Sequence, residues 1–380
     1  MKFTVNRHLF SQRLKNVLLA ITFKTPIPIL TGLKLEVAPE GIFLTGSNAE
    51  ISIESFISVD DEEADLVIEN TGGIVLQPAS FFKDIVTNLP GEHFTLEVKD
   101  QVTALISSKD SQFEIRVVNV DEYPLLPQMD MMNAFTLPVP ILKEIISQTI
   151  IAVSPHESRP ILTGIQFTLK DGYFKAVATD SHRLSQRIVE LDNVGDLDYQ
   201  IVIPGSSLNE LSKILTDDIK EVTVSIVNNQ ILFQTEDTHF YSRLLEGNYP
   251  QTDQLFSDEW STKITVDIPL LKGAVNRASL LSHAGNNNVV TLNITANNLQ
   301  ITGKSLDVGM VEEDIPYKEI VGDDLTISFN PDYLKDALNT FGGSEVTIKF
   351  QSALRSFTLL PAHTENEAAF IQLITPIRTR

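Results

Sequence analysis

The chain has 380 residues, of which 42% are apolar and 21% are charged, and it contains no cysteine. This length suits two or three domains, the apolar content can fill several cores, and the lack of cysteine excludes disulfides and thiolate metal sites. The formal net charge of −21 argues against a protein that grips nucleic acid by neutralising phosphates, because such proteins usually carry basic patches.

The chain opens on Met-Lys-Phe-Thr-Val, which predicts a strand entering a fold. It does not match a secretory signal, because no apolar core follows a basic segment. No apolar run in the sequence reaches the length of a membrane span. We therefore expect a cytoplasmic protein without membrane contact.

A short segment recurs along the chain. Pro-Ile-Leu-Thr-Gly-Leu at residues 28–33 returns as Pro-Ile-Leu-Thr-Gly-Ile at residues 160–165, and a degraded copy stands at residues 290–294. Each copy partly alternates apolar and polar residues, which predicts a half-buried strand. A second strand is expected after each copy, at residues 42–46, 174–178 and 299–303.

Helices are predicted at repeating positions as well. Each unit opens with one, over residues 7–20, 141–152 and 270–281. A second helix follows a strand and a proline at Pro78, Pro204 and Pro331, where proline in the first helical turn loses no hydrogen bond. The fold class is therefore α+β, in three similar domains at residues 1–127, 128–258 and 259–380, with linkers near 125–133 and 251–261.

The patterns of known catalytic and metal sites are missing. The seven histidines stand singly, so we expect no metal site and no cofactor. The segment Gly303-Lys304-Ser305 lacks the upstream glycine of a phosphate-binding loop, since Asn298 occupies that position, and a turn after a strand fits it better.

One polar cluster stands out at residues 179–184, Thr-Asp-Ser-His-Arg-Leu. Asp180, Ser181 and His182 are the residue types of a hydrolase triad, but neighbours on an extended chain point to opposite faces. A turn that carries a binding surface fits the cluster better, and no catalytic residue is expected.

Several of these segments together resemble a known family. They are the opening Met-Lys-Phe-Thr-Val, the two Pro-Ile-Leu-Thr-Gly copies, the segment around His182 and the ending Leu-Ile-Thr-Pro-Ile-Arg at residues 373–378. The chain resembles, from end to end, the bacterial DNA polymerase III β subunit family, the sliding clamps. Ser181 stands where that family commonly has glycine.

The resemblance implies a non-enzymatic ring that confers processivity in DNA replication. Two protomers of three clamp domains, each with two helices on antiparallel sheets, would join head to tail with six-fold pseudo-symmetry around duplex DNA. Retention by topology removes the objection from net charge, and a pore of constant width needs no base contacts. The implied partners are duplex DNA, the replicative polymerase, a clamp-loader ATPase and other proteins with clamp-binding motifs.

Three sets of residues are expected to form contacts. Basic residues on the helices and before the repeated segments would face DNA: Arg7, Arg13, Lys24, Lys83, Arg159, Lys213 and Arg277. Position matching to the family implies a dimer interface of Phe113 and Ile115 against Leu280 and Leu281. It also implies a cleft for partner peptides, with apolar anchors and a polar rim, made of Leu162, Thr179, Ser181, His182, Arg183, Leu184, Pro250, Leu255, Leu373, Ile374, Pro376, Ile377 and Arg378.

Two other functions stay open from the sequence. A multidomain interaction scaffold that never touches DNA would share the peptide cleft, but it could be a monomer. An enzyme of unknown class would lose its activity when His182 is replaced by alanine. Ordinary core packing also explains each of the apolar interface and cleft residues taken singly.

Overall fold

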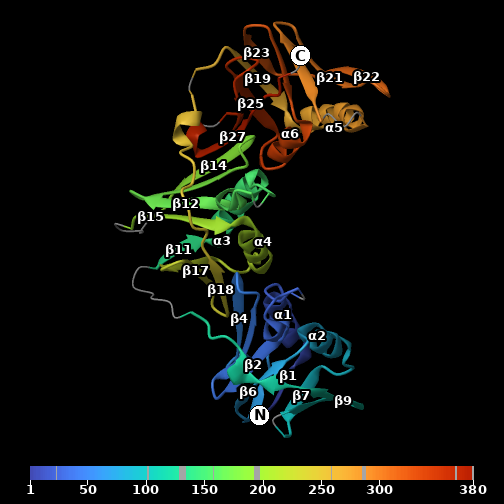
Figure 1. Ribbon diagram of the computed structural model, residues 1–380, viewed down its shortest axis with the longest axis vertical. Helices are drawn as coiled ribbons and strands as arrows, with labels where there is room; N and C mark the ends of the chain where they lie inside the picture. Colours follow the sequence, from blue (N-terminus) through green and yellow to red (C-terminus); the bar gives the residue numbers. More distant parts are fainter. Residues whose placement is uncertain are drawn as a thin grey trace. The chain divides into compact units, whose positions relative to one another are not determined.

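The computed structural model (Figure 1) describes residues 1–22, 24–100, 102–127, 134–156, 158–191, 197–257, 259–284, 288–363 and 366–378. The chain packs into two compact units. Unit 1 contains residues 1–140 and 206–244, and unit 2 contains residues 141–205 and 245–380. The middle repeat is therefore divided between the two units.

The described residues form six α-helices, two for each repeat, as the sequence predicts. The helices are α1 (Arg7–Leu18), α2 (Ala79–Asn88), α3 (Val139–Thr149), α4 (Gly205–Ile214), α5 (Ile268–Ala284) and α6 (Pro331–Leu338). Side-chain caps fix three of the starts. Asp267 Oδ1 accepts a hydrogen bond from the Leu270 N–H in the first turn of α5. Asn6 Oδ1 accepts hydrogen bonds from the N–H groups of His8 and Leu9, and Asn330 Oδ1 accepts one from Asp332.

Two of the three prolines at the second helices lie outside the first helical turn, where all three were predicted. Only Pro331 lies in the first helical turn. Pro78 is the N-cap residue of α2, and Pro204 ends the strand before α4. The prediction of a proline inside all three helices was wrong, because the helix starts one residue later at two of them.

Unit 1 contains two antiparallel sheets. The first has the strand order β5 (Val67–Asn70), β1 (Lys2–Asn6), β7 (His93–Val98), β8 (Thr103–Ser108) and β9 (Ser111–Arg116). The second has the order β10 (Val118–Asn119), β6 (Gly72–Leu76), β2 (Leu33–Ala38), β3 (Gly41–Ser47), β4 (Ile51–Ser58), β18 (Thr238–Arg243), β17 (Gln230–Gln234), β16 (Glu221–Val227) and β11 (Phe135–Pro138). The pairing of β4 with β18 joins the first repeat to half of the middle one.

Unit 2 repeats this arrangement. Its longer sheet has the order β15 (Tyr199–Pro204), β12 (Gly164–Lys170), β13 (Tyr173–Thr179), β14 (Arg183–Glu190), β27 (Phe370–Ile374), β26 (Phe357–Pro361), β25 (Glu345–Phe350), β19 (Thr262–Asp267) and β23 (Glu319–Gly322). The shorter one has the order β22 (Gly309–Asp314), β21 (Asn298–Ser305), β20 (Val290–Thr295) and β24 (Leu325–Phe329). The pairing of β14 with β27 joins the middle repeat to the third.

Each unit buries its own apolar core. Strand β4 alternates buried and partly exposed residues, as expected for a sheet with one covered face. In unit 1, Phe10 packs edge-on against Phe82 and Phe94, with ring centroids 5.9 and 5.0 Å apart. In unit 2, Phe357 packs against Phe329 and Phe350. The contacts of Phe10 hold α1 against α2 and β7, whereas the contact of Phe357 with Phe329 joins the two sheets of unit 2.

The repeated Pro-Ile-Leu-Thr segment is a 3₁₀ turn, so the prediction of a strand there was wrong. Pro28–Thr31 and Pro160–Thr163 each form a 3₁₀ helix. Proline fixes φ near −65° at the first helical position, and the threonine hydroxyls donate to the carbonyls of Pro28 and Pro160 at 2.9 and 2.7 Å. The strands β2 and β12 begin only after these turns. The third copy, without proline, is the strand β20.

The remaining structural predictions concern strands, a turn and a linker around the repeats. The strands predicted at residues 42–46, 174–178 and 299–303 are confirmed as parts of β3, β13 and β21. Gly303-Lys304-Ser305 ends β21 and is not the turn that we expected. Of the linker at 125–133, residues 128–133 lie outside the described residues. Among the described helices, none combines the length and apolar character needed to cross a bilayer.

Close packing of α5 on β21 requires a glycine, which gives a test of the fold. A Cβ at Gly303 would lie 2.3 Å from the Ala278 carbonyl oxygen, whereas at Gly342 it would meet no atom within 4 Å. We expect Gly303→Ala to reduce the free energy of unfolding by about 2 kcal/mol, because backbone atoms must move apart. Gly342→Ala is the control and should change it little. Urea unfolding measures both, and equal midpoints would contradict this packing.

Candidate functional site

The polar cluster at residues 179–183 forms the turn between β13 and β14, as predicted. Asp180 Oδ1 accepts hydrogen bonds from the N–H groups of His182 and Arg183, at 2.8 and 3.0 Å. The Thr179 hydroxyl donates to the Arg183 carbonyl at 2.7 Å and accepts from the Ser181 N–H at 3.1 Å. The side chains of Asp180 and Thr179 thus hydrogen-bond to the backbone of the turn, so both residues shape it. The side chains of Ser181 and His182 are left exposed.

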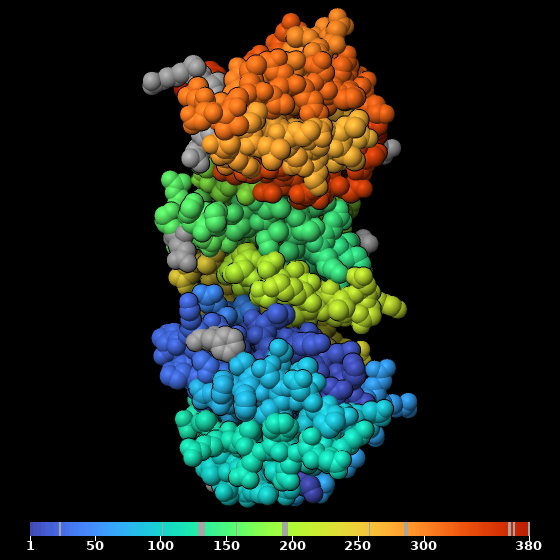
Figure 2. All heavy atoms as spheres, turned by 90° about the vertical axis from the view of Figure 1, so that its right-hand side faces the viewer, coloured from blue at the N-terminus to red at the C-terminus, as the bar shows by residue number. Residues whose placement is uncertain are grey.

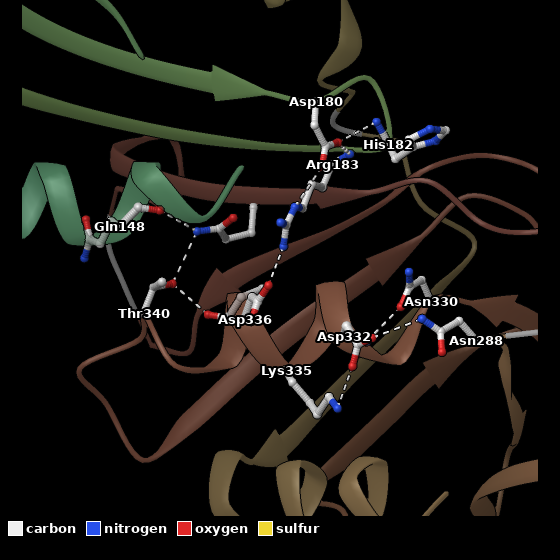
Figure 3. Close-up of polar contacts among 12 residues, drawn as sticks. Gln148, Asp180, His182, Arg183, Asn288, Asn330, Asp332, Lys335, Asp336 and Thr340 are labelled. Atoms are coloured by element: carbon white, nitrogen blue, oxygen red, sulfur yellow. Dashed lines mark hydrogen bonds and ion pairs between the residues drawn. The ribbon is translucent and has the colours of Figure 1, made fainter. Parts of the chain in front are cut away.

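Arg183 connects this turn to α6 (Figure 3). Its guanidinium lies between two carboxylates, with Nε 3.0 Å from Asp180 Oδ2 and a terminal nitrogen 2.6 Å from Asp336 Oδ2. The same group lies 4.5 Å above the ring of Tyr333, and the His182 ring stacks on that ring at 6.4 Å. Burial, and then the Asp180 charge, raise the pKa of Tyr333. Two carboxylates and an aromatic face thus fix the position of Arg183.

The C-terminal segment lies beside the turn because β14 pairs with β27. Arg183 is opposite Ile374 and Leu184 is opposite Leu373 in this register. Beyond the strand, the Thr375 N–H donates to the His182 carbonyl at 2.9 Å, and the Ile377 N–H donates to the Ser328 carbonyl at 2.7 Å. The pairing therefore brings residues 373–378 to residues 181–184, which are almost 200 positions away in the sequence.

An apolar cluster lies beneath the turn. Leu162, Leu184 and Leu373 are buried together with Val177, Val202 and Tyr249. The Tyr249 hydroxyl accepts a hydrogen bond from the Thr179 N–H at 3.1 Å, and burial raises the pKa of Tyr249. Ile374 points to the other side of β27, into the main core of the third repeat. Leu162, Leu184, Leu373 and Ile374, which were expected in the cleft, are therefore buried in the cores. They pack behind the exposed residues of the site.

The exposed part of the predicted set is smaller. The side chains of Pro250, Leu255, Ile377 and Arg378 are exposed, and Pro376 is partly exposed. Leu255 lies in the short 3₁₀ helix Asp253–Leu255 and lines a hollow with Trp260, Gln351 and Arg355. The residues that a ligand could touch directly are therefore Ser181, His182, Pro250, Leu255, Ile377 and Arg378, while Arg183 is only partly exposed.

Sequence reasoning missed the contribution of α6 and of Tyr249. Tyr333 and Asp336 hold Arg183, but they stand about 150 positions beyond it, and the sequence pattern marks them only as part of an amphipathic helix. Tyr249 belongs to a Tyr-Pro pair that recurs at the ends of the first two units, at residues 123–124 and 249–250. That repetition was the one available signal for a structural role.

Most of the basic residues expected to face DNA are already bound within the protein. Arg13 pairs with Asp237, Lys213 with Glu210 and Arg277 with Glu313. Lys83 lies 3.7 Å from Asp84, and the Arg7 guanidinium donates to the carbonyls of Thr87 and Gly91 at the end of α2. Lys24 and Arg159 are exposed, and Arg159 lies 3.5 Å from the Ser181 hydroxyl. The other five of these residues lie on α-helices. One of those helices, α5, forms part of the face of unit 2 in Figure 2 (light orange).

The pair on α5 joins two guanidinium nitrogens to both oxygens of one carboxylate. Two nitrogens of Arg277 contact the two carboxylate oxygens of Glu313 on β22, at 2.8 and 2.5 Å. This guanidinium holds the pKa of Glu313 below its ordinary value. A phosphate would have to compete with that carboxylate for Arg277, so the helix surface offers less free positive charge than a count of bases suggests.

The four residues predicted to form a dimer interface lie at the margins of the two units. Phe113 and Ile115 lie on β9, which ends its sheet, and their side chains are exposed and partly exposed. Leu280 and Leu281 lie near the end of α5, where Leu280 is largely exposed. Within the described part of the chain, β9 and β22 each have one edge without a partner strand.

The described residues offer no metal site. In the ranges that the structure covers, no three His, Asp or Glu side chains gather close enough to hold one ion. The Asp180 carboxylate is occupied by backbone N–H groups and Arg183, so it does not orient His182 as a triad acid would.

Comparison with known proteins agrees with this picture. Sequence models of the DNA polymerase III beta subunit match its N-terminal domain at residues 1–127, its central domain at 136–251 and its C-terminal domain at 253–378. The beta sliding clamp of Streptococcus pneumoniae is 44% identical over 99% of both chains, and that of Bacillus subtilis is 42% identical over 100% of both. Crystal structures of the S. pneumoniae DNA polymerase III beta chain and of the B. subtilis sliding clamp superpose over the full length of both chains, with TM-scores of 0.97 and 0.96.

The turn contains a conformation that favours glycine, which can be tested. Ser181 has a φ of 79°, in the left-handed region that costs non-glycine residues about 1–2 kcal/mol. Ser181→Gly should therefore increase the free energy of unfolding by roughly 0.5–1 kcal/mol after the entropy of glycine is counted. Ser147→Gly on the exposed face of α3 should instead decrease it by about 0.5 kcal/mol. Thermal unfolding measures both; destabilisation by Ser181→Gly would show that the turn has another conformation.

Proposed function

The chain belongs to the DNA polymerase III beta subunit family, the beta sliding clamps, and we propose that it acts as a ring that encircles duplex DNA. Two copies join head to tail, so that six similar domains, at residues 1–127, 128–258 and 259–380 of each copy, surround the duplex. The ring tethers the replicative polymerase and makes synthesis processive.

The order of strands at the repeat junctions carries this proposal. The last strand of one repeat pairs with the fourth strand of its neighbour twice within the chain, as β18 with β4 and as β27 with β14. The corresponding strands at the two ends are β9, which is followed in the first repeat only by the two-residue strand β10, and β22, the fourth strand of the third repeat. Each has an unpaired edge in the described part of the chain. A third junction of the same kind, formed with a second copy, satisfies both edges. Because the two edges differ, the contact is head to tail, and such a contact forms a ring where the rotation between copies closes. We propose that two copies, with six similar domains, complete that rotation.

The exposed apolar residues at these ends support the same contact. Phe113 on β9 and Leu280 on α5 each expose a large apolar surface. We propose that they pack across the junction, together with Ile115 and Leu281. Burial of such residues at the centre of an interface stabilises a durable dimer.

The charge distribution favours retention by topology over adhesion. The chain carries a net charge of −21, and Arg13, Lys213 and Arg277 are paired with carboxylates. A surface with few free cations releases few counterions from DNA and binds weakly. Weak contacts through Lys24, Arg159 and the paired bases allow sliding, while the closed ring prevents escape. A clamp-loader ATPase must therefore open the ring.

The surface around the β13–β14 turn is the proposed site for partner peptides. Leu255 and Ile377 supply exposed apolar contacts, and His182, Arg183 and Arg378 supply a polar rim. The buried residues Leu162, Leu184 and Leu373 support this surface. Peptides from the polymerase, the clamp loader and other replication or repair proteins would compete for it. The protein is proposed to act in the cytoplasm without catalysis or cofactor.

Encirclement makes a direct prediction. Once loaded on nicked circular duplex, the protein should stay bound through gel filtration at about 0.5 M salt, because the salt screens attraction but does not break a ring. Cutting the circle once should release most of it within minutes. The same protein mixed with linear DNA is the control. Equal retention on cut and uncut circles would contradict the proposal, and a monomer in gel filtration would favour a scaffold that never encloses DNA.

The peptide site is tested by its exposed residues. Leu255→Asp and Ile377→Asp should each weaken binding of a polymerase C-terminal peptide at least about tenfold, because each removes an apolar contact and adds a charge. Tyr173→Asp, at an exposed aromatic residue on the other end of β13, is the matched control. Fluorescence anisotropy measures the dissociation constants. Wild-type affinity in both Leu255 and Ile377 variants would exclude this surface as the site.

A further inference from the structure

A hollow of about 640 Å³ lies beside the proposed peptide site in unit 2. One wall is the linker that carries Leu255 and Trp260, and the other is the loop after β25 that carries Gln351 and Arg355. Leu255, which is 55% exposed, belongs both to this hollow and to the proposed peptide site. Cavities of this size hold small ligands or a few side chains. A peptide that contacts Leu255 can therefore continue into the hollow.

Hydrogen bonds fix the two walls of the hollow to each other. The Ser261 hydroxyl donates to the Gln351 carbonyl at 2.9 Å, and the Gln351 side-chain amide donates to the Ser257 hydroxyl at 2.8 Å. The hydroxyls of Ser356 and Thr375 lie 3.4 Å apart, so the loop also lies beside the C-terminal segment of the peptide site. The hollow is thus formed before any ligand binds, which reduces the entropy that binding costs.

Arg355 is an exposed cation in this hollow without a carboxylate partner. Among the described residues no ion pair involves its guanidinium, whereas Arg13, Lys213 and Arg277 are all paired. Glu259 also lines the hollow, but within the described ranges no ion pair joins it to Arg355. A guanidinium can form two parallel hydrogen bonds with one carboxylate. On a chain of net charge −21, this free arginine is a contact point for an acidic ligand.

Trp260 gives the same hollow an apolar surface. It is 39% exposed, and Leu354, the neighbour of Arg355 in the loop, is 62% exposed. The Lys263 ammonium lies 5.8 Å from the centre of the indole ring and pairs with Glu319 at 2.8 Å, which holds it in place. Tryptophan and arginine are the residues that most often anchor a binding partner. The hollow therefore fits a ligand with an acidic and an apolar side chain close together.

We propose that this hollow binds the segment that flanks the contact residues of a partner peptide, with an acidic side chain at Arg355 and an apolar one on Trp260. This inference rests on the peptide site proposed above and adds a second point of recognition to it. Peptides that make the same contacts with Leu255 and Ile377 then differ in affinity according to the residues beside those contacts. The hollow favours partners with an acidic and apolar flank when several compete for one site.

The test compares a polymerase C-terminal peptide with the same peptide extended by Glu-Glu-Phe at one end or at the other, by fluorescence anisotropy. One of the two extended peptides should bind the wild-type protein at least about fivefold more tightly. The gain should shrink at about 0.5 M salt, because salt screens exposed charge pairs. Arg355→Glu should abolish the gain and leave the affinity for the unextended peptide unchanged. Lys304→Glu, at an exposed lysine in the other sheet of unit 2, is the matched control and should keep the gain.

A charge swap separates a direct contact from an indirect effect. The Arg355→Glu variant should bind a peptide extended by Lys-Lys-Phe more tightly than one extended by Glu-Glu-Phe, because the charges are then complementary again. Far-UV circular dichroism confirms that each variant is folded.

Trp260 supplies a second measurement, since it is the only tryptophan in the chain. With peptides that lack tryptophan, the tighter extended peptide should shift its fluorescence emission, and the unextended peptide should not. Equal affinity for short and extended peptides, or an emission that the extended peptide leaves unchanged, would overturn this inference and leave the peptide site intact. A wild-type protein that binds not even the unextended peptide would overturn the peptide site, and this inference with it.

Discussion

Backbone pairing at the edges of the sheets is the constraint on which the rest of this structure depends. An unpaired strand edge exposes N–H and C=O groups that bind to any available strand. The chain satisfies two such edges internally, by pairing β4 with β18 and β14 with β27. This pairing makes each nine-stranded sheet common to two repeats, and it explains why the compact units do not coincide with the three repeats.

The candidate binding surface is a consequence of one of those junctions. Pairing of β14 with β27 brings the turn around His182 to the C-terminal segment and to α6. Arg183 then binds Asp180 on its own turn and Asp336 on the helix, so one side chain fixes the geometry between two repeats. A partly buried cation between two carboxylates resists displacement, because moving it would leave charges unpaired. The exposed rim therefore rests on a rigid base.

Charge pairing explains how an acidic protein can act on DNA. The helices carry basic residues, but nearby carboxylates balance the positive charges of Arg13, Lys213 and Arg277. Such a surface tolerates a polyanion without holding it tightly, which suits movement along the duplex. In the proposed ring, residence depends on how stably the ring stays closed, and so on the apolar contacts proposed at the free ends. The two demands, weak adhesion and strong closure, are met by different residues.

Much of the fold follows from the sequence because it repeats. The sequence predicted the opening helix of each unit, a second helix after each proline, and a strand after each repeated segment. The prediction of a strand at the repeated Pro-Ile-Leu-Thr segment was wrong. Proline and a hydrogen bond from the threonine side chain impose a local 3₁₀ turn there, which periodicity does not reveal. For the site, the sequence identified the turn at residues 179–184 and the C-terminal segment, and the resemblance supplied their joint role.

Only the tertiary structure decided which of these residues face solvent and what holds them. Leu162, Leu184 and Ile374 share the apolar character of Leu255 and Ile377, but tertiary packing buries the first three and leaves the last two exposed. Tyr333, Asp336 and Tyr249 enter the site through contacts with residues 70 or more positions away. The sequence by itself determined the repeats, the elements and the absence of cysteine chemistry, because these are local or compositional. The partners of Arg183 depended on strand register, which is set by packing between distant segments.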